Sequence, residues 1–218
     1  MTMTTLDHGP GILAIPAMEW IWTASAQAIA ALSNALPAGS VTGYQTGPHS
    51  IAAKRNYFVR ELLERPELGW LLFVDSDACP PPIAAERLLS HNVPIVAALA
   101  ALRGPPFLHS HTEIIGRGPG PLLETEQTGM HTTLIRREVF ERVPGPWFDH
   151  GLTPGYGEDT HFCAHVRAHG ERIFVDSQFQ VGHIAVLSID NTLQDAYWQT
   201  PAGRAGIERH HAEHDRSG

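Results

Sequence analysis

Short runs of consecutive apolar residues recur along the first hundred residues, and longer segments with helical spacing lie between them. The candidate strands cover residues 11–17, 40–47, 70–77 and 93–100. The candidate helices cover residues 18–36, 50–65 and 81–92, and Ser50 stands where it can cap the second of them. Apolar strands without polar alternation are typical of a sheet that is covered on both faces. The pattern therefore predicts an α/β layer architecture with a mostly parallel central sheet.

The second half of the chain is less regular, and Gly and Pro are frequent between residues 103 and 129. A strand that runs into a short helix is predicted at 130–143, and a further helix at 158–170, with acids at its start and Gly170 at its end. Two more strands are expected at 172–176 and 179–186, and a flexible loop at 146–157. We treat residues 1–218 as a single domain that ends in a tail at 188–218.

Composition excludes several classes of protein. The formal net charge of -8 gives the chain no overall attraction for nucleic acid, and a hydrophobic content of 43% argues against disorder. Only two cysteines occur, which favours a reducing compartment, and we expect a cytoplasmic protein. The first residues do not resemble a signal peptide, and no apolar stretch is long enough to span a membrane. We therefore expect a soluble protein without a membrane span.

Two aspartates directly follow the apolar run at 70–74, in the sequence "LLFVDSDACPPP". Ligands of α/β proteins bind at the carboxyl ends of the parallel strands, where Asp75 and Asp77 are expected. If the backbone is still extended there, both side chains project to the same side and repel each other. A Mg²⁺ or Mn²⁺ ion, held by one or two carboxylates and by substrate phosphates, offsets that repulsion. The alternative is that one aspartate caps the next helix and the other is solvated, and the spacing alone favours neither.

The order of several motifs resembles the GT-A fold glycosyltransferases, most closely the family-2-like members with a DXD motif. The matching pieces are "ILAIPAMEW", "HSIAAKRN", "WLLFVDSDACPPP", "LIRREVFERV", "GEDTHFC" and "VGH". Together they extend over roughly residues 11 to 185. The resemblance implies a GT-A, Rossmann-like α/β/α sandwich. It also implies a nucleotide-sugar donor half at 11–103 and an acceptor and metal half at 104–187.

The resemblance also implies roles for individual residues. Asp77 matches the DXD aspartate that binds the metal, with His183 as a late ligand of the same ion, which is Mn²⁺ or Mg²⁺. Outside this context, a lone His on a strand is more often a core or surface residue. Glu158 and Asp159 match the acidic pair that supplies the general base, and we assign that role to Asp159. Acids at a helix start can equally cap free N–H groups and complement the helix dipole.

Other matched positions point to the nucleotide. Asp75 corresponds to the aspartate nearer the ribose, and Arg55 to a residue that contacts the nucleotide or a neighbouring acid. A solvated helix charge is the alternative for Arg55. The remaining nucleotide-binding candidates follow the first and second strands and are Pro16, Ala17, Glu19 and Gln45.

These expectations combine into a metal-dependent glycosyltransferase that moves a sugar from a UDP or GDP donor to an unknown acceptor, with inversion. Two alternatives stay open. A GT-A-like nucleotidyltransferase would use the same strands for a nucleoside triphosphate, although "AIPAMEW" lacks the Gly-rich, basic loop that such enzymes carry. A catalytically silent nucleotide-sugar-binding protein would keep the fold without the reaction, although the acidic residues and His183 are all present.

Overall fold

The computed structural model describes residues 8–103, 108–111, 113–150, 157–185, 191–201, 203–205 and 208. Contacts within the chain divide it into two units, Met1–Ile184 and Ala185–Gly218. The second unit contains the helix α6 (Asn191–Trp198), in a region where the sequence predicts only a tail. No helix among the described residues combines the length and the apolar character that crossing a membrane requires.

The first unit is built on an eight-stranded sheet, counted over the described residues, with the strand order β2-β1-β3-β8-β5-β9-β7-β6. Its strands are β1 (Ile12–Pro16), β2 (Val41–Gln45), β3 (Trp70–Val74), β5 (Ile95–Leu99), β6 (Ile114–Arg117), β7 (Leu122–Thr125), β8 (Thr132–Arg136) and β9 (Ile173–Gln180). In this described sheet, two strands, β7 and β8, run opposite to the other six. A small second sheet pairs β4 (Ala78–Cys79) with β10 (Gly182–His183) in antiparallel fashion.

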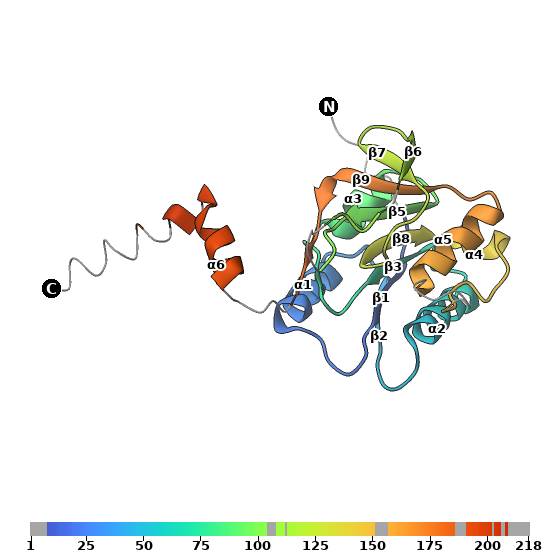
Figure 1. The fold of residues 1–218 in the computed structure, drawn as a ribbon. Coiled ribbons are helices and arrows are strands. Elements are labelled where there is room, and N and C mark those ends of the chain that lie inside the picture. The colour runs from blue at the N-terminus through green and yellow to red at the C-terminus, as the bar shows by residue number, and fades with distance from the viewer. Residues whose placement is uncertain are drawn as a thin grey trace, which may run out of the picture. The chain divides into compact units, whose positions relative to one another are not determined.

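Helices cover both faces of the main sheet (Figure 1). One face carries α1 (Thr23–Asn34) and α3 (Ala84–Ser90), and the other carries α2 (Ile51–Glu64), α4 (Arg137–Arg142) and α5 (Glu158–Ala168). Successive residues of a strand therefore enter different cores. Leu71 and Phe73 pack with α2 and α5, whereas Leu72 and Val74 pack with α1 and α3. This explains why the strands are uniformly apolar, and it confirms the predicted α/β class.

Most predicted elements form, with changes at their ends. The Ser50 side chain accepts a hydrogen bond from the Ala53 N–H at 3.2 Å, as expected of an N-cap, and Gly170 follows α5 with a φ of +86°. The helix predicted from residue 18 begins only at Thr23. The strand predicted to reach Asp77 ends at Val74, where Asp75 begins a turn closed by the Ala78 N–H and the Asp75 carbonyl at 3.0 Å. The two strands predicted at 172–176 and 179–186 are largely one strand, β9, followed by the short β10.

Candidate functional site

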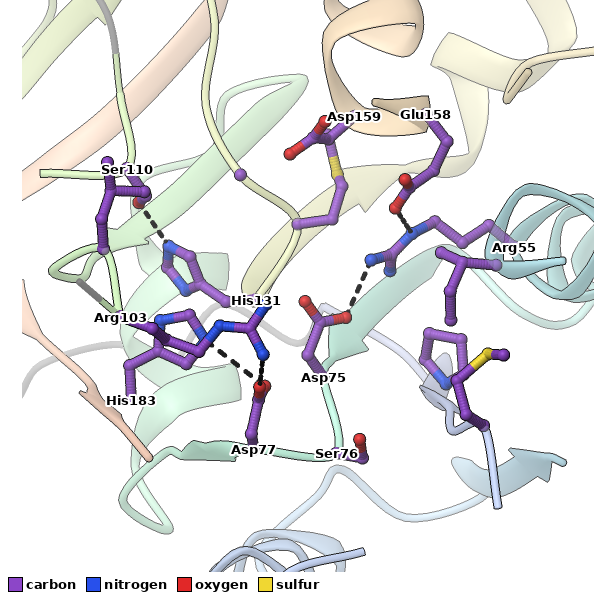
Figure 2. A pocket seen from close by; sticks show the side chains of 16 residues that line it. Arg55, Asp75, Ser76, Asp77, Arg103, Ser110, His131, Glu158, Asp159 and His183 are labelled. Carbon is purple, nitrogen blue, oxygen red and sulfur yellow. Dashed lines mark hydrogen bonds and ion pairs between the residues drawn. The ribbon is translucent and has the colours of Figure 1, made fainter. Parts of the chain in front are cut away.

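A pocket of about 420 Å³ lies at the carboxyl ends of β1 and β3, where the fold predicts a ligand site. It brings together residues that lie far apart in the chain, from Pro16 to His183, and Figure 2 shows their side chains. The predicted site residues that line it are Pro16, Arg55, Asp75, Asp77, Glu158, Asp159 and His183. The loop predicted at 146–157 falls partly outside the described residues, which stop at 150 and resume at 157.

Arg55 joins two of the acids in a buried network. Its Nη2 donates to Asp75 Oδ1 at 2.8 Å, and its Nε donates to Glu158 Oε1 at 3.0 Å. The guanidinium also lies 5.0 Å from the centre of the Phe73 ring. Burial acts to lower the pKa of Arg55, but the charges of Asp75 and Glu158 outweigh burial and raise it. The Arg55 side chain thus connects the turn after β3 to the start of α5, and both carboxylates share its single positive charge.

Asp77 has different partners from Asp75, although both side chains line the same pocket (Figure 2). Its carboxylate accepts a hydrogen bond from Arg103 Nη1 at 2.7 Å and lies 3.3 Å from His183 Nε2. Burial acts to raise the pKa of Asp77, but the hydrogen bond to His183 and the charges of His183 and Arg103 together lower it. The Arg103 side chain is 62% exposed, so this ion pair is a weak one that solvent screens.

The position of His183 is determined by β10. The backbone of β10 pairs with β4, and the Ile184 N–H donates to the Asp77 carbonyl at 2.8 Å. His183 Nδ1 lies 3.0 Å from the Ala101 carbonyl oxygen and must carry a proton to donate to it. In the neutral imidazole, Nε2 therefore carries the lone pair on the side of Asp77. The hydrogen bond to Asp77 is the main cause that raises the pKa of His183.

Asp159 is the acid of the pocket that is paired with no cation among the described residues. Its Oδ1 accepts a hydrogen bond from the Thr160 N–H at 2.7 Å. Burial first, and then the neighbouring charge of Glu158, raise the pKa of the Asp159 carboxyl. A carboxylate with a raised pKa and no bound cation is able to accept a proton from a ligand.

Three nucleotide-binding candidates lie outside this pocket. The Ala17 side chain is buried, and the Ala17 carbonyl accepts a hydrogen bond from Lys54 Nζ at 2.7 Å. Glu19 is exposed, in the segment that precedes α1. Gln45 lines a separate cavity of about 170 Å³ between β2 and α2. The structure therefore does not gather these three residues with Asp75 and Asp77.

Sequence reasoning missed several residues of the pocket. His131 precedes β8, and its carbonyl accepts a hydrogen bond from the Asp75 N–H at 3.0 Å. Because β8 is antiparallel to β3, the beginning of β8 lies beside the carboxyl end of β3, where the pocket is. A search limited to the carboxyl ends of strands therefore overlooks His131. Arg103 and Ser110 come from the Gly- and Pro-rich segment after β5, where the sequence shows no periodicity that could place them.

The charges that line the pocket have a chemical consequence. Its wall carries four carboxylates, Asp75, Asp77, Glu158 and Asp159, against two guanidinium groups, Arg55 and Arg103. An anionic ligand therefore needs an additional cation. Within the described part of the chain, no group of three or more His, Cys, Asp or Glu residues is arranged to hold a metal. Asp77 and His183 offer one oxygen and one nitrogen, which suits an ion that takes its other ligands from water and phosphates.

Comparisons with known proteins agree on the fold. The sequence matches no protein-family model and no curated protein. The crystal structure of A197 from STIV is similar with a TM-score of 0.60 and 21% identity, over 83% of this chain and 86% of that one. A structure of GalNAc-T7 with UDP, GalNAc and Mn²⁺ is similar with a TM-score of 0.55 and 9% identity, over 83% of this chain. This chain covers 45% of the GalNAc-T7 chain. The protein has a GT-A-like, glycosyltransferase-like fold.

Proposed function

We propose that the protein is a metal-dependent glycosyltransferase that moves a sugar from a UDP or GDP donor to an acceptor, with inversion at the sugar carbon. The observation that carries the proposal is one pocket of a GT-A-like fold in which the Asp77–His183 pair and the Asp159 carboxylate line the same space. A similar fold, GalNAc-T7, has been solved with UDP and Mn²⁺.

Asp77 and His183 are the residues that would hold a Mn²⁺ or Mg²⁺ ion. His183 donates through Nδ1 to a backbone carbonyl, which is the usual support of a metal-binding histidine and leaves Nε2 for the ion. Arg103 compensates the charge of Asp77 through a largely exposed side chain, so displacing it costs little. When bound, the divalent cation offsets the negative charge that develops on the leaving diphosphate.

Asp159 is the proposed general base. An inverting transfer needs one carboxylate beside the acceptor hydroxyl, which takes its proton as the sugar carbon is attacked. Glu158 is unsuited to this role, because its Oε1 is paired with the buried Arg55. Arg55 positions Asp75, the proposed ribose-side acid, and Glu158 at the same time. Pro16, which ends β1 and lines the pocket, marks the side on which we place the nucleoside.

The reaction is tested by measuring release of nucleoside diphosphate from UDP-sugars and GDP-sugars in the presence of Mn²⁺ and a panel of sugar, lipid and peptide acceptors. We expect Asp159→Asn to lower transfer by about 10²- to 10⁴-fold and to leave donor binding, measured by calorimetry, intact. Glu67→Gln is the matched control, because Glu67 is exposed and precedes the opposite end of β3.

The same assays separate the alternatives. Pyrophosphate release from a nucleoside triphosphate and a sugar phosphate, without transfer from nucleotide sugars, replaces the proposal with a nucleotidyltransferase. Metal-dependent binding of nucleotide sugars without hydrolysis or transfer identifies a silent binding protein. If UDP and GDP with Mn²⁺ do not bind at all, and Asp77→Ala behaves as the unaltered protein does, the proposal is wrong.

A further inference from the structure

Ser110 and His131 form a hydrogen-bonded pair in the wall of the pocket. Ser110 Oγ lies 2.8 Å from His131 Nε2, and Figure 2 shows the pair on the same side of the pocket as Asp77 and His183. His131 is only 3% exposed, and its carbonyl accepts a hydrogen bond from the Asp75 N–H. The Ser110 backbone is fixed from both sides, since its N–H donates to the Ala100 carbonyl at 2.9 Å and its carbonyl accepts from the Gly129 N–H at 2.9 Å. Backbone hydrogen bonds therefore hold both members of the pair in place.

The surroundings of His131 indicate which atom of the pair is the donor. Its Nδ1 is buried and has no hydrogen-bond partner within the described structure. A proton on Nδ1 would leave a buried donor unsatisfied, which is costly. The favoured neutral tautomer carries its proton on Nε2 and donates to Ser110 Oγ. The hydroxyl hydrogen of Ser110 is then left for a different acceptor, and no described residue takes it.

The position of Ser110 indicates which part of a ligand it reaches. Gly129 lies between Ser110, His131 and Asp159: a Cβ added to Gly129 would be 3.3 Å from His131, 3.5 Å from Ser110 Cβ and 3.9 Å from Asp159 Oδ2. In the proposed transfer, the sugar must lie between the diphosphate held at Asp77 and the acceptor hydroxyl beside Asp159. Ser110 and the side-chain-free surface of Gly129 border that same space.

We propose that Ser110 donates a hydrogen bond to a hydroxyl or carbonyl oxygen of the donor sugar, and that His131 is the positioning residue that orients the Ser110 hydroxyl. This inference rests on the proposed function and adds to it a residue that distinguishes a nucleotide sugar from the bare nucleotide. The pair contributes to sugar recognition, whereas Asp77 contributes to recognition of the diphosphate.

The test compares dissociation constants measured by calorimetry with Mn²⁺ for UDP, GDP, UDP-glucose, UDP-N-acetylgalactosamine and GDP-mannose. We expect Ser110→Ala to weaken binding of the preferred nucleotide sugar by about threefold to tenfold and to leave binding of its bare nucleotide unchanged. Ser110→Thr, which keeps the hydroxyl, is expected to retain most of the affinity for the nucleotide sugar that Ser110→Ala loses. Ser90→Ala is the control, because it removes an exposed hydroxyl at the end of α3, outside the pocket.

His131 is tested in the same assay. His131→Phe removes the donor to Ser110 and should reduce the preference for the nucleotide sugar over the bare nucleotide, as Ser110→Ala does. The double variant should lose no more of this preference than either single variant loses. His131→Gln, which supplies an amide donor instead, should lose less of this preference than His131→Phe. If Ser110→Ala weakens binding of the nucleotide and of the nucleotide sugar equally, or weakens binding of neither, the inference is wrong while the proposed function stands. If no probe binds to the unaltered protein, the proposed function fails and the inference fails with it.

Discussion

Asp75 and Asp77 are separated by one residue, but the turn between them gives them different partners. Asp75 is held by the buried Arg55, whereas Asp77 faces an exposed arginine and His183. The sequence places both aspartates at the carboxyl end of a parallel strand, and in the structure both follow β3 and line the pocket there. The expectation that they project to the same side assumed an extended backbone. β3 instead ends at Val74, and the turn that follows still brings both side chains into the same pocket.

Different consequences follow from replacing each aspartate. Asp75→Asn weakens the ion pair between Asp75 and the buried Arg55, so we expect it to lower the free energy of unfolding by about 1–3 kcal/mol. Asp77→Asn weakens the pair with the exposed Arg103 and the contact with His183 at 3.3 Å, so it should cost about 1 kcal/mol or less but remove Mn²⁺-dependent nucleotide binding. Urea unfolding and calorimetry measure the two effects. Equal stabilities, or equal Mn²⁺ dependence, would contradict the assignment of separate roles.

His131 makes the stability of the protein depend on pH. Burial lowers its pKa to about 4, from an ordinary value of 6.5. Between these two pH values the unfolded chain binds a proton that the folded chain does not, so the contribution to stability is lost as the pH falls through this window. We expect a loss of roughly 2 kcal/mol between pH 7 and pH 5. Urea unfolding of the unaltered protein and of His131→Gln tests this, and identical pH dependence of the two proteins is the contrary result.

At the scale of elements, the start of α5 controls the proposed base. Gly157 precedes the helix, and a Cβ added there would come within 2.7 Å of Asp159 Oδ1. The backbone of Gly157 has a φ of -81°, which alanine adopts without strain, and the atom it meets is the end of a movable side chain. The Gly157→Ala substitution therefore displaces the carboxylate more than it disturbs the fold.

We expect Gly157→Ala to lower transfer by at least about tenfold, because a general base must stay within hydrogen-bond reach of its proton. Its melting temperature and its affinity for the donor nucleotide should remain close to those of the unaltered protein. Gly69→Ala is the control, since the added Cβ meets only ordinary contacts, at 3.8 Å and 3.9 Å. Unchanged transfer by Gly157→Ala would argue against Asp159 as the base.

The elements that the sequence predicts well are those with strong local signals. Apolar runs and helical spacing locate β1, β3, β5 and α2, and with them Arg55 and the edge that carries the aspartates. The two-residue strands β4 and β10 have no local signal, because pairing between residues 78–79 and 182–183 creates them. Arg103 and Ser110 lie beside the antiparallel bridge between Ala101 and His109, a contact for which the sequence gives no periodic signal either. Local patterns cannot predict such contacts.

For the molecule as a whole, charge supports the metal-dependent account. The chain carries a formal net charge of -8, and the pocket is itself rich in carboxylates. The proposed nucleoside diphosphate would bring further negative charge to this site, and Arg55 is already paired with Asp75 and Glu158. Binding without a divalent cation is therefore disfavoured by repulsion, and the cation and the nucleotide should bind together.

The most direct test of this account is a thermal-shift panel of nucleotides and nucleotide sugars, each with and without Mn²⁺. We predict that at least one UDP or GDP compound raises the melting temperature only when Mn²⁺ is present. Asp77→Asn should lose this stabilisation, and the surface control Glu67→Gln should retain it. If no compound stabilises the protein, or if Asp77→Asn responds as the unaltered protein does, Asp77 is not the metal-binding residue of a nucleotide-sugar site.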